Sequence, residues 1–200
     1  SHLSSGDEIK NNYNIIQNKK FKDSFKNFKN IKYKSISNSM GIILGKNYHH
    51  DLVRPGISIY GGHFNTKMKS IIRPVICLKS KVLQIKEINK NEFVGYNQTF
   101  KTSKKIKVAI IAIGYADGIS RVLSNKGEVY HEGKTYKIIG RVSMDSITID
   151  ITKNYQNIKE GVYMELINHE YGIDYHAKKS RTICDEVLTS ISKRVKRVYI

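Results

Sequence analysis

Two tyrosines in glycine-flanked turns are the residues whose types and spacing suggest chemistry. Tyr96 directly follows Gly95, Tyr115 directly follows Gly114, and an apolar run at 107–113 lies between them. The run is too short to cross a membrane and is typical of a buried strand. Glycine permits a positive φ and the close approach of a ligand or another chain, so each tyrosine should hold its hydroxyl in a defined place. Taken alone, the pattern also fits two turn tyrosines that merely cap a core strand.

Composition narrows the class of protein. The chain has 200 residues and is 40% hydrophobic, enough for one large or two small globular domains with a real core. Its net charge of +18 favours binding to an anionic partner, such as nucleic acid or an anionic membrane surface. The charge is mostly lysine scattered among Asn and Ile, and lysine lacks the planar fork that suits bidentate phosphate or base recognition. A basic nucleic-acid binder is therefore a minor alternative.

The cysteines and the first residues bear on the cellular setting. Cys77 and Cys184 have no C-x-x-C spacing, so they form neither a metal motif nor a disulfide framework, which fits a reducing compartment. No signal peptide or membrane span is recognisable. We therefore expect a cytoplasmic protein without a metal or a membrane partner. The chain begins Ser-His-Leu without an initiator Met, from which we expect a processed product, an excised piece or the product of a broken gene.

The first third of the chain alternates helix and strand patterns. Ser5 and Glu8 have the spacing of a capping box, which predicts the start of a helix. The apolar face of that helix is expected to carry Ile16, Phe21, Phe25 and Phe28. Alternation of this kind indicates βα units with a parallel sheet. The expected elements are, in order, a strand end at 1–5, a helix to about Asn30, a strand at 31–36, a turn at 38–41 into a second helix and a strand at 53–61.

The pattern changes near residue 65, where strands begin to follow one another closely. Glu132 and Gly133 form a hairpin pattern between two of these strands. Closely spaced strands with turn residues between them predict an antiparallel sandwich or barrel. The boundary divides the chain into domains at 1–66 and 67–200. The expected strands are roughly 72–87, 107–113, 128–131, 135–140, 146–151 and 161–167, followed by a helical piece at 180–193 and a closing strand at 194–200.

Several short motifs together resemble alanine racemase, a fold-type III pyridoxal-phosphate enzyme, over essentially the whole chain. Singly they are weak, but in one order with family-like spacing they form a specific pattern. They are Ser1-His2-Leu3, Asp7-Glu8, Asn38-Ser39, Val53-Arg54-Pro55-Gly56-Ile57, Tyr60-Gly61, Gly95-Tyr96, Gly114-Tyr115-Ala116-Asp117-Gly118, Gly140-Arg141-Val142-Ser143-Met144-Asp145, Glu186-Val187-Leu188-Thr189 and Arg194-Val195. The resemblance implies an α/β barrel fragment, the C-terminal part of a (β/α)8 barrel, followed by a complete, mainly antiparallel β domain. The family segment that carries the Schiff-base lysine would precede His2.

The resemblance implies a site for proton transfer at an amino-acid α-carbon. Tyr96 matches the tyrosine base that one subunit offers to the cofactor of its partner, while the lysine acts from the opposite face. A phenol has a pKa near 10 and needs nearby positive charge, which His2 and Arg54 match in the family's hydrogen-bonded chain. Arg54 also matches the group at the pyridine nitrogen of the cofactor. Standing alone, His2 would be a satisfied core histidine and Arg54 a surface ion pair.

The remaining matched residues would hold the cofactor phosphate and guide the substrate. Ser39, Gly56 and Ile57 match the phosphate donors, and the Met144 backbone N–H matches a donor to the substrate carboxylate. Ordinary turn chemistry also explains Ser39 and Gly56. The matched channel residues are Asp7 and Tyr115 at an inner gate, and Arg121, Arg141 and Ile183 outside it.

One position departs from the family, which usually has an aromatic residue where this chain has Asp185. A carboxylate beside a phosphate is repulsive, so either the local alignment shifts at this position or phosphate affinity and channel closure are compromised. The resemblance predicts a cytoplasmic bacterial alanine racemase, an isomerase that makes D-alanine for cell-wall peptidoglycan. It would act as a head-to-tail homodimer or with a complementary N-terminal portion, and the isolated chain should be inactive. The alternative is an inactive split or decayed fragment that serves only as a dimerising β module.

Overall fold

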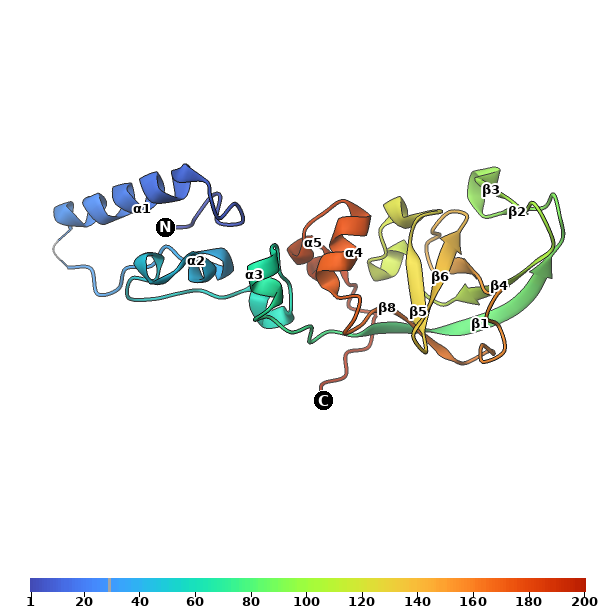
Figure 1. The fold of residues 1–200 in the computed structure, drawn as a ribbon. Coiled ribbons are helices and arrows are strands. Elements are labelled where there is room, and N and C mark those ends of the chain that lie inside the picture. The colour runs from blue at the N-terminus through green and yellow to red at the C-terminus, as the bar shows by residue number, and fades with distance from the viewer. Residues whose placement is uncertain (29) are drawn as a thin grey trace. The chain divides into compact units, whose positions relative to one another are not determined.

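The computed structural model describes residues 1–28 and 30–200, and the side chain of Thr66 lies outside that description. The chain divides into two compact units, Ser1–Pro74 and Val75–Ile200 (Figure 1). The predicted domain boundary between residues 66 and 67 falls inside the first compact unit and stays a prediction.

The first unit begins with α1 (Asn12–Ser24), which continues into a 3-10 turn at Phe25–Asn27. The cap is Asn11, whose side chain accepts a hydrogen bond from the Tyr13 N–H at 2.8 Å. The capping box predicted at Ser5 and Glu8 is wrong, because these residues form a turn in which the Glu8 N–H donates to the Ser5 carbonyl. The helix also stops before Asn30, the predicted end.

The buried face of α1 is polar rather than the predicted apolar face. Asn14 and Asn18 are buried, whereas Ile16 and Phe28 are exposed. The Asn14 amide donates to the Ser5 and Glu8 carbonyls, and the Asn18 amide donates to the Asn47 carbonyl. These bonds satisfy backbone groups of the neighbouring loops, which an apolar side chain could not do.

The second helix of this unit, α2 (Ser39–Leu44), starts where the sequence predicts. Asn38 is its cap, accepting a hydrogen bond from the Gly41 N–H at 3.1 Å. Three short helical pieces follow at Lys46–Tyr48, Ile57–Tyr60 and α3 (Thr66–Lys69).

The strands predicted at 1–5, 31–36 and 53–61 are not formed in the described residues of this unit. These segments still lie side by side, since the Ser1 amino group donates to the Ser35 carbonyl and the Arg54 N–H donates to the Ser37 carbonyl. The contacts are too sparse for a ladder, in which donors and acceptors repeat along both strands. Pro55 has no N–H to contribute, and at Gly56 the backbone turns into the helical piece that follows.

The second unit is a closed barrel of six strands, all antiparallel, as the spacing of the strands predicted. Isoleucine, valine and methionine side chains fill it, among them Val108, Ile149 and Met164 with no exposed surface. The strands, in their order around the barrel, are β1 (Leu78–Ile88), β4 (Ile106–Ile111), β7 (Ile147–Asp150), β6 (Lys134–Ile139), β5 (Glu128–His131) and β8 (Tyr163–Ile167).

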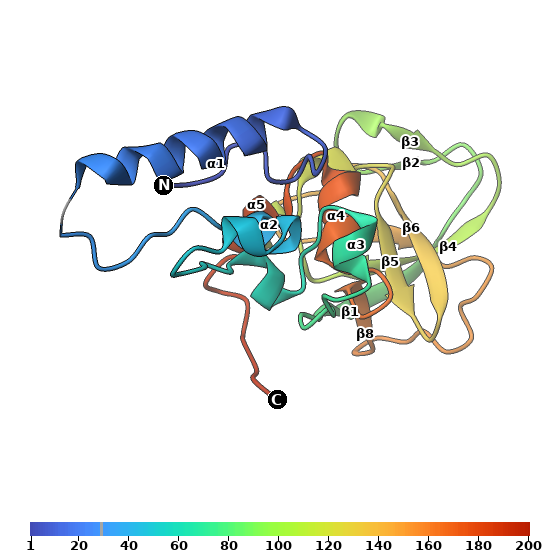
Figure 2. The same cartoon turned by 60° about the vertical axis from the view of Figure 1, so that its left-hand side comes forward.

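The hairpin between β5 and β6 is the one that the sequence predicts, and the two strands run side by side in Figure 2. Glu132 and Gly133 have φ angles of 47° and 70°, the two positive values that a tight two-residue hairpin turn requires. A small ribbon of β2 (Phe93–Val94) and β3 (Phe100–Lys101), which the sequence did not predict, projects beyond the barrel (Figure 1).

Helices α4 (Ile173–Ser180) and α5 (Cys184–Ser190) follow the barrel, so helical structure begins earlier than the predicted residue 180. The closing strand predicted at 194–200 is wrong. The Arg197 guanidinium instead donates to the Ile191, Ser192 and Val195 carbonyls, which holds the chain in a compact turn rather than beside a strand. None of the helices in the described residues is long and apolar enough to cross a bilayer.

Candidate active site

Three turns of the β domain meet at one place because glycines let their backbones touch. Gly95, with φ of 78°, lies so close to the 140–141 peptide that an added Cβ would stand 2.7 Å from the Arg141 nitrogen. Gly140, with φ of 74°, has the reciprocal contact, since a Cβ there would stand 2.7 Å from the Val94 carbonyl oxygen. No side chain fits in either gap. The turn that carries Tyr96 is therefore packed directly on the loop that leads to Met144.

The turn at residues 114–118 packs on the same loop. A Cβ on Gly114 would stand 2.3 Å from the carbonyl oxygens of Ser143 and Met144. Two backbone hydrogen bonds close this contact, from the Tyr115 N–H to the Ser143 carbonyl at 2.9 Å and from the Ala116 N–H to the Met144 carbonyl at 3.0 Å. The predicted residues Tyr96 and Tyr115 thus lie on two turns that both pack on the loop that carries Met144.

The side chains on these turns face solvent rather than the core. Tyr96 is 70% exposed, Met144 53% and Tyr115 43%. Within the described residues the Tyr96 hydroxyl and the Met144 N–H make no hydrogen bond. Both groups can therefore serve a molecule outside the domain, because an exposed donor or acceptor is satisfied by water until a ligand replaces it.

The residues that the resemblance assigned to the outer channel lie on the same domain. Arg121 is exposed in a 3-10 turn, and Arg141 is half-buried with an Nε atom that has no partner among the described residues. Ile183 is 54% exposed and directly precedes α5. The start of α5 reaches Tyr115, because Thr182 and Tyr115 line one cavity of about 240 Å³.

Asp185 lies in the first turn of α5 and is exposed. A carboxylate at a helix N-terminus interacts favourably with the helix dipole, which gives this residue a local structural role. Its backbone carbonyl accepts a hydrogen bond from the Thr189 hydroxyl at 2.9 Å. The structure thus accommodates Asp185 without supplying the hydroxyl that the usual aromatic residue would offer.

The first unit gathers donors around the hydroxyl of Ser39. That oxygen accepts from the Gly56 N–H at 2.9 Å, and it lies 3.4 Å from the Ser58 N–H and 3.1 Å from the Ser58 hydroxyl. A Cβ added to Gly56 would meet nothing within 4 Å, so space is open beside these donors. Several donors gathered beside open space suit a phosphate group. Ser58 was not predicted, although its hydroxyl faces the predicted Ser39.

Ile57 is buried and begins the 3-10 turn, and within the described residues its N–H makes no hydrogen bond. The amide therefore remains available beside the two serines. The structure brings Ser39, Gly56 and Ile57 close together, and the role in phosphate binding that the resemblance implied for them stays a prediction.

Arg54 and His2 lie at the same end of this unit but do not bond each other. The Arg54 guanidinium donates to the Ser35 hydroxyl and, at 2.6 Å, to the Ser1 carbonyl. The His2 ring nitrogen Nε2 lies 3.0 Å from the Asn38 side-chain nitrogen. Asp7 is exposed and belongs to this unit, whereas Tyr115 belongs to the other.

A buried histidine stands behind the turns of the β domain. His176 lines the same cavity as Tyr115, and one of its ring nitrogens donates to the Leu166 carbonyl. Burial lowers the pKa of His176 from 6.5 to about 4, so the ring is neutral at physiological pH. Among residues 1–28 and 30–200, no group of three or more His, Cys, Asp or Glu is placed to hold a metal ion.

Comparison with known proteins agrees with this arrangement. The alanine racemase C-terminal domain family matches residues 75–199, and the alanine racemase N-terminal domain family matches residues 1–63. The two matches fall on the two compact units, the N-terminal family on the first and the C-terminal family on the second. The chain belongs to the alanine racemase family, which confirms the fold class and the family predicted from the sequence.

Individual relatives give the extent of the match. The chain is 40% identical to an alanine racemase from Rickettsia akari over its whole length, which is 55% of that protein. A crystal structure of alanine racemase from Bartonella henselae with covalently bound pyridoxal phosphate is 38% identical, has a TM-score of 0.91 and is covered to 55%. Alanine racemase from Streptomyces coelicolor, at 27% identity, has a TM-score of 0.92 and 55% coverage. The chain spans about half the length of the relatives it matches.

Proposed function

We propose that this chain is the C-terminal portion of a pyridoxal-phosphate-dependent alanine racemase, an isomerase that interconverts L- and D-alanine. One observation supports it above the others, which is the exposed Tyr96 on a turn packed against the loop of Met144. A phenol and a peptide N–H held on adjacent turns suit proton exchange at a carbon atom beside a carboxylate. In a bacterial cytoplasm the D-alanine would supply cell-wall peptidoglycan.

The residues around Ser39 fit the phosphate of pyridoxal phosphate, the cofactor named for the Bartonella henselae relative. The Ser39 and Ser58 hydroxyls and the N–H groups of Gly56 and Ile57 would hold it. When bound, the cofactor supplies an electron sink that acidifies the substrate α-carbon. Arg54 would face the pyridine nitrogen, where a guanidinium donates a hydrogen bond but keeps its proton, which weakens the sink and limits side reactions.

Tyr96 would take or return the α-proton on one face of the substrate. Its exposed side chain suits action in trans, on the cofactor site of a partner subunit in a head-to-tail dimer or of a complementary N-terminal portion. A phenol needs nearby positive charge to act as a base near neutral pH, and His2 and Arg54 of that site would provide it.

Met144 and the channel residues would bind and guide the substrate. The Met144 N–H, which has no bond within the described residues, would donate to the alanine carboxylate. Asp7 and Tyr115 would form the inner gate of the channel, and Arg121, Arg141 and Ile183 the layer outside it. The two arginines would attract the carboxylate electrostatically.

Complementation tests this proposal. The chain is mixed with the preceding half of the Rickettsia akari racemase and pyridoxal phosphate, and D-alanine formed from L-alanine is measured. Tyr96→Phe should lower the turnover by about 10²–10⁴-fold, the usual contribution of a positioned acid or base. Tyr163→Phe is the matched control, because Tyr163 is an exposed tyrosine on strand β8 of the same barrel.

Asp185 favours the competing function of a non-catalytic dimerising module. Under that alternative, the mixture would form a complex by size-exclusion chromatography but make no D-alanine. Equal turnover by the Tyr96→Phe and Tyr163→Phe proteins would show that Tyr96 is not the base, even if racemisation itself occurs.

A further inference from the structure

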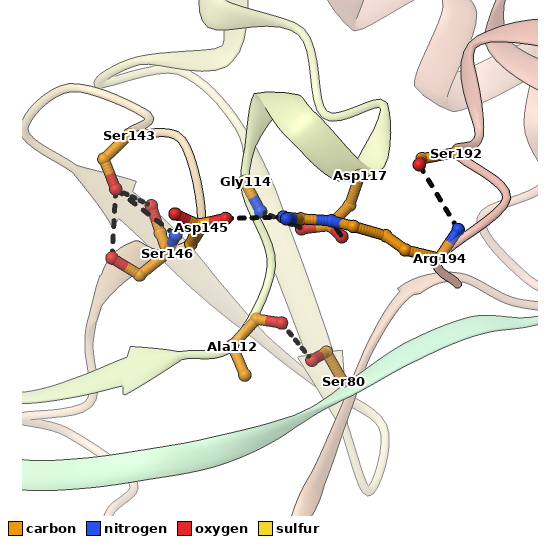
Figure 3. Close-up of polar contacts among 9 residues, drawn as sticks. All are labelled: Ser80, Ala112, Gly114, Asp117, Ser143, Asp145, Ser146, Ser192 and Arg194. Carbon is orange, nitrogen blue, oxygen red and sulfur yellow. Dashed lines mark hydrogen bonds and ion pairs between the residues drawn. The ribbon is translucent and has the colours of Figure 1, made fainter. Parts of the chain in front are cut away.

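Arg194 joins two of the turns that carry proposed site residues, and no role was predicted for it from the sequence. Its Nε donates to Asp117 Oδ1 at 2.6 Å, and its Nη2 donates to Asp117 Oδ2 at 3.0 Å and to Asp145 Oδ1 at 2.6 Å (Figure 3). The guanidinium therefore binds the Asp117 carboxylate with two parallel hydrogen bonds, and its Nη2 atom also donates to the Asp145 carboxylate. Such bidentate geometry fixes direction as well as distance.

Each carboxylate belongs to a turn of the candidate site. Asp117 lies two residues after Tyr115, and its Oδ2 also accepts from the Gly114 N–H at 2.8 Å (Figure 3). Asp145 directly follows Met144, whose carbonyl accepts from the Ala116 N–H. Met144 is thus bonded to the 114–118 turn, and its neighbour Asp145 is bonded to Arg194.

The segment that presents Arg194 is itself fixed. The Ser192 N–H donates to the Asp117 carbonyl at 3.2 Å, and a Cβ on Gly118 would stand 2.6 Å from the Ser190 carbonyl oxygen. The Arg197 guanidinium adds its bonds to three carbonyls of the same turn. Arg194 is therefore anchored at its backbone as well as at its charged end.

We propose that Arg194 is a positioning residue that sets the Met144 peptide and the Tyr115 turn for the substrate carboxylate. It acts through Asp117 and Asp145 and touches no reacting atom. It also offsets charge, because both carboxylates accept from one guanidinium and without it two uncompensated negative charges would adjoin the place proposed for an anionic group. The effect on substrate rests on the proposed function, whereas the effect on the turns does not.

The two ion pairs of Arg194, with Asp117 and with Asp145, differ in exposure, and this difference makes the proposal testable. The Asp117 side chain is 11% exposed and also holds Gly114, so its loss would disturb the fold. The Asp145 side chain is 64% exposed, and an exposed ion pair adds little to global stability. Asp145→Ala therefore removes the link to the Met144 loop while the barrel stays folded.

Amide hydrogen exchange in the 200-residue chain gives the first readout. In Arg194→Gln and Asp145→Ala, exchange at Tyr115 and Ala116 should speed up by about tenfold, while barrel amides such as Val108 keep their rates. Lys105→Gln is the matched control, since it breaks the exposed Lys105–Glu87 pair at 2.5 Å in the same domain. Unchanged exchange at the turn, or an equal increase throughout the barrel, would overturn the proposal.

Kinetics of the complemented racemase give the second readout. A carboxylate contact made equally in the ground and transition states changes KM rather than kcat, so Asp145→Ala should raise KM for alanine by about tenfold and move kcat by less than about threefold. A loss of kcat at unchanged KM would overturn the positioning role. If no variant and not even the unaltered chain racemises alanine, the proposed function fails, and the exchange rates alone decide the role of Arg194.

Discussion

His176 should make the β domain sensitive to acid, and the magnitude follows from its burial. The side chain is 7% exposed, one ring nitrogen bonds the Leu166 carbonyl, and burial lowers its pKa from 6.5 to about 4. In the unfolded chain the ring returns to an ordinary pKa, so between pH 6.5 and 4 the unfolded state binds more protons than the folded state. Stability therefore falls as pH falls through this window.

The full shift corresponds to about 3 kcal/mol, at 1.4 kcal/mol for each pKa unit. Most of it develops above pH 4, and about 2 kcal/mol should be lost between pH 7 and pH 5. Because His176 lies behind Tyr115 in the same cavity, the loss weakens the part of the domain that supports the candidate site.

Urea denaturation at pH 7 and pH 5, followed by circular dichroism, measures this effect. His176→Gln removes the titrating group, so its free energy of unfolding should fall by about 2 kcal/mol less between the two pH values than that of the unaltered chain. Other acidic groups contribute equally to both proteins and cancel in the comparison. His131→Gln, on strand β5 of the same barrel, controls for the removal of a histidine. Equal pH dependence in the unaltered and His176→Gln proteins would refute the reasoning.

Two further predictions concern the turns and the first unit. Gly114→Ala should destabilise the β domain by about 3 kcal/mol, because its Cβ would overlap two backbone carbonyls at 2.3 Å. Gly133→Ala is the control and should cost about 1 kcal/mol for its positive φ, because its Cβ would meet nothing within 4 Å. Denaturation midpoints measure both losses of stability, and equal losses would contradict the close contact at Gly114. Limited trypsin digestion should cut after Lys32 or Lys34 before it cuts at any site in the barrel. This stretch lies outside any helix or strand, and Tyr33 within it is exposed. Earlier cleavage within the barrel would contradict this order.

The barrel strands could be predicted because their hydrophobic pattern and their burial have the same cause. Ile106–Ile111 forms β4, close to the apolar run at 107–113, and the turn at Glu132 and Gly133 needs only local backbone chemistry. Asn38 likewise caps α2 through a bond to a residue three positions along. Each of these features depends on neighbours in the sequence.

The failures arise where distant residues decide the outcome. Asn18 is buried because the Asn47 carbonyl, 29 positions further along the chain, needs a donor, which no helical periodicity reveals. The Arg194 bridge joins residues separated by 77 and 49 positions, so no local pattern announces it. Arg194 and Asp145 each appeared within a family motif, but the motifs do not show that the two side chains form an ion pair.

The three turns also explain why glycines recur beside the proposed site residues. At Gly95, Gly114 and Gly140 an added Cβ would collide with backbone atoms of a neighbouring turn, so the turns touch peptide to peptide. Backbone contacts are stiffer than contacts between long side chains, and they leave the side chains of Tyr96 and Met144 free to face outward. The proposed action of Tyr96 on a neighbouring subunit would require this combination of a rigid peptide and an exposed side chain. A base presented in this way would lose little conformational freedom on meeting its substrate, because the turn that carries it is already fixed.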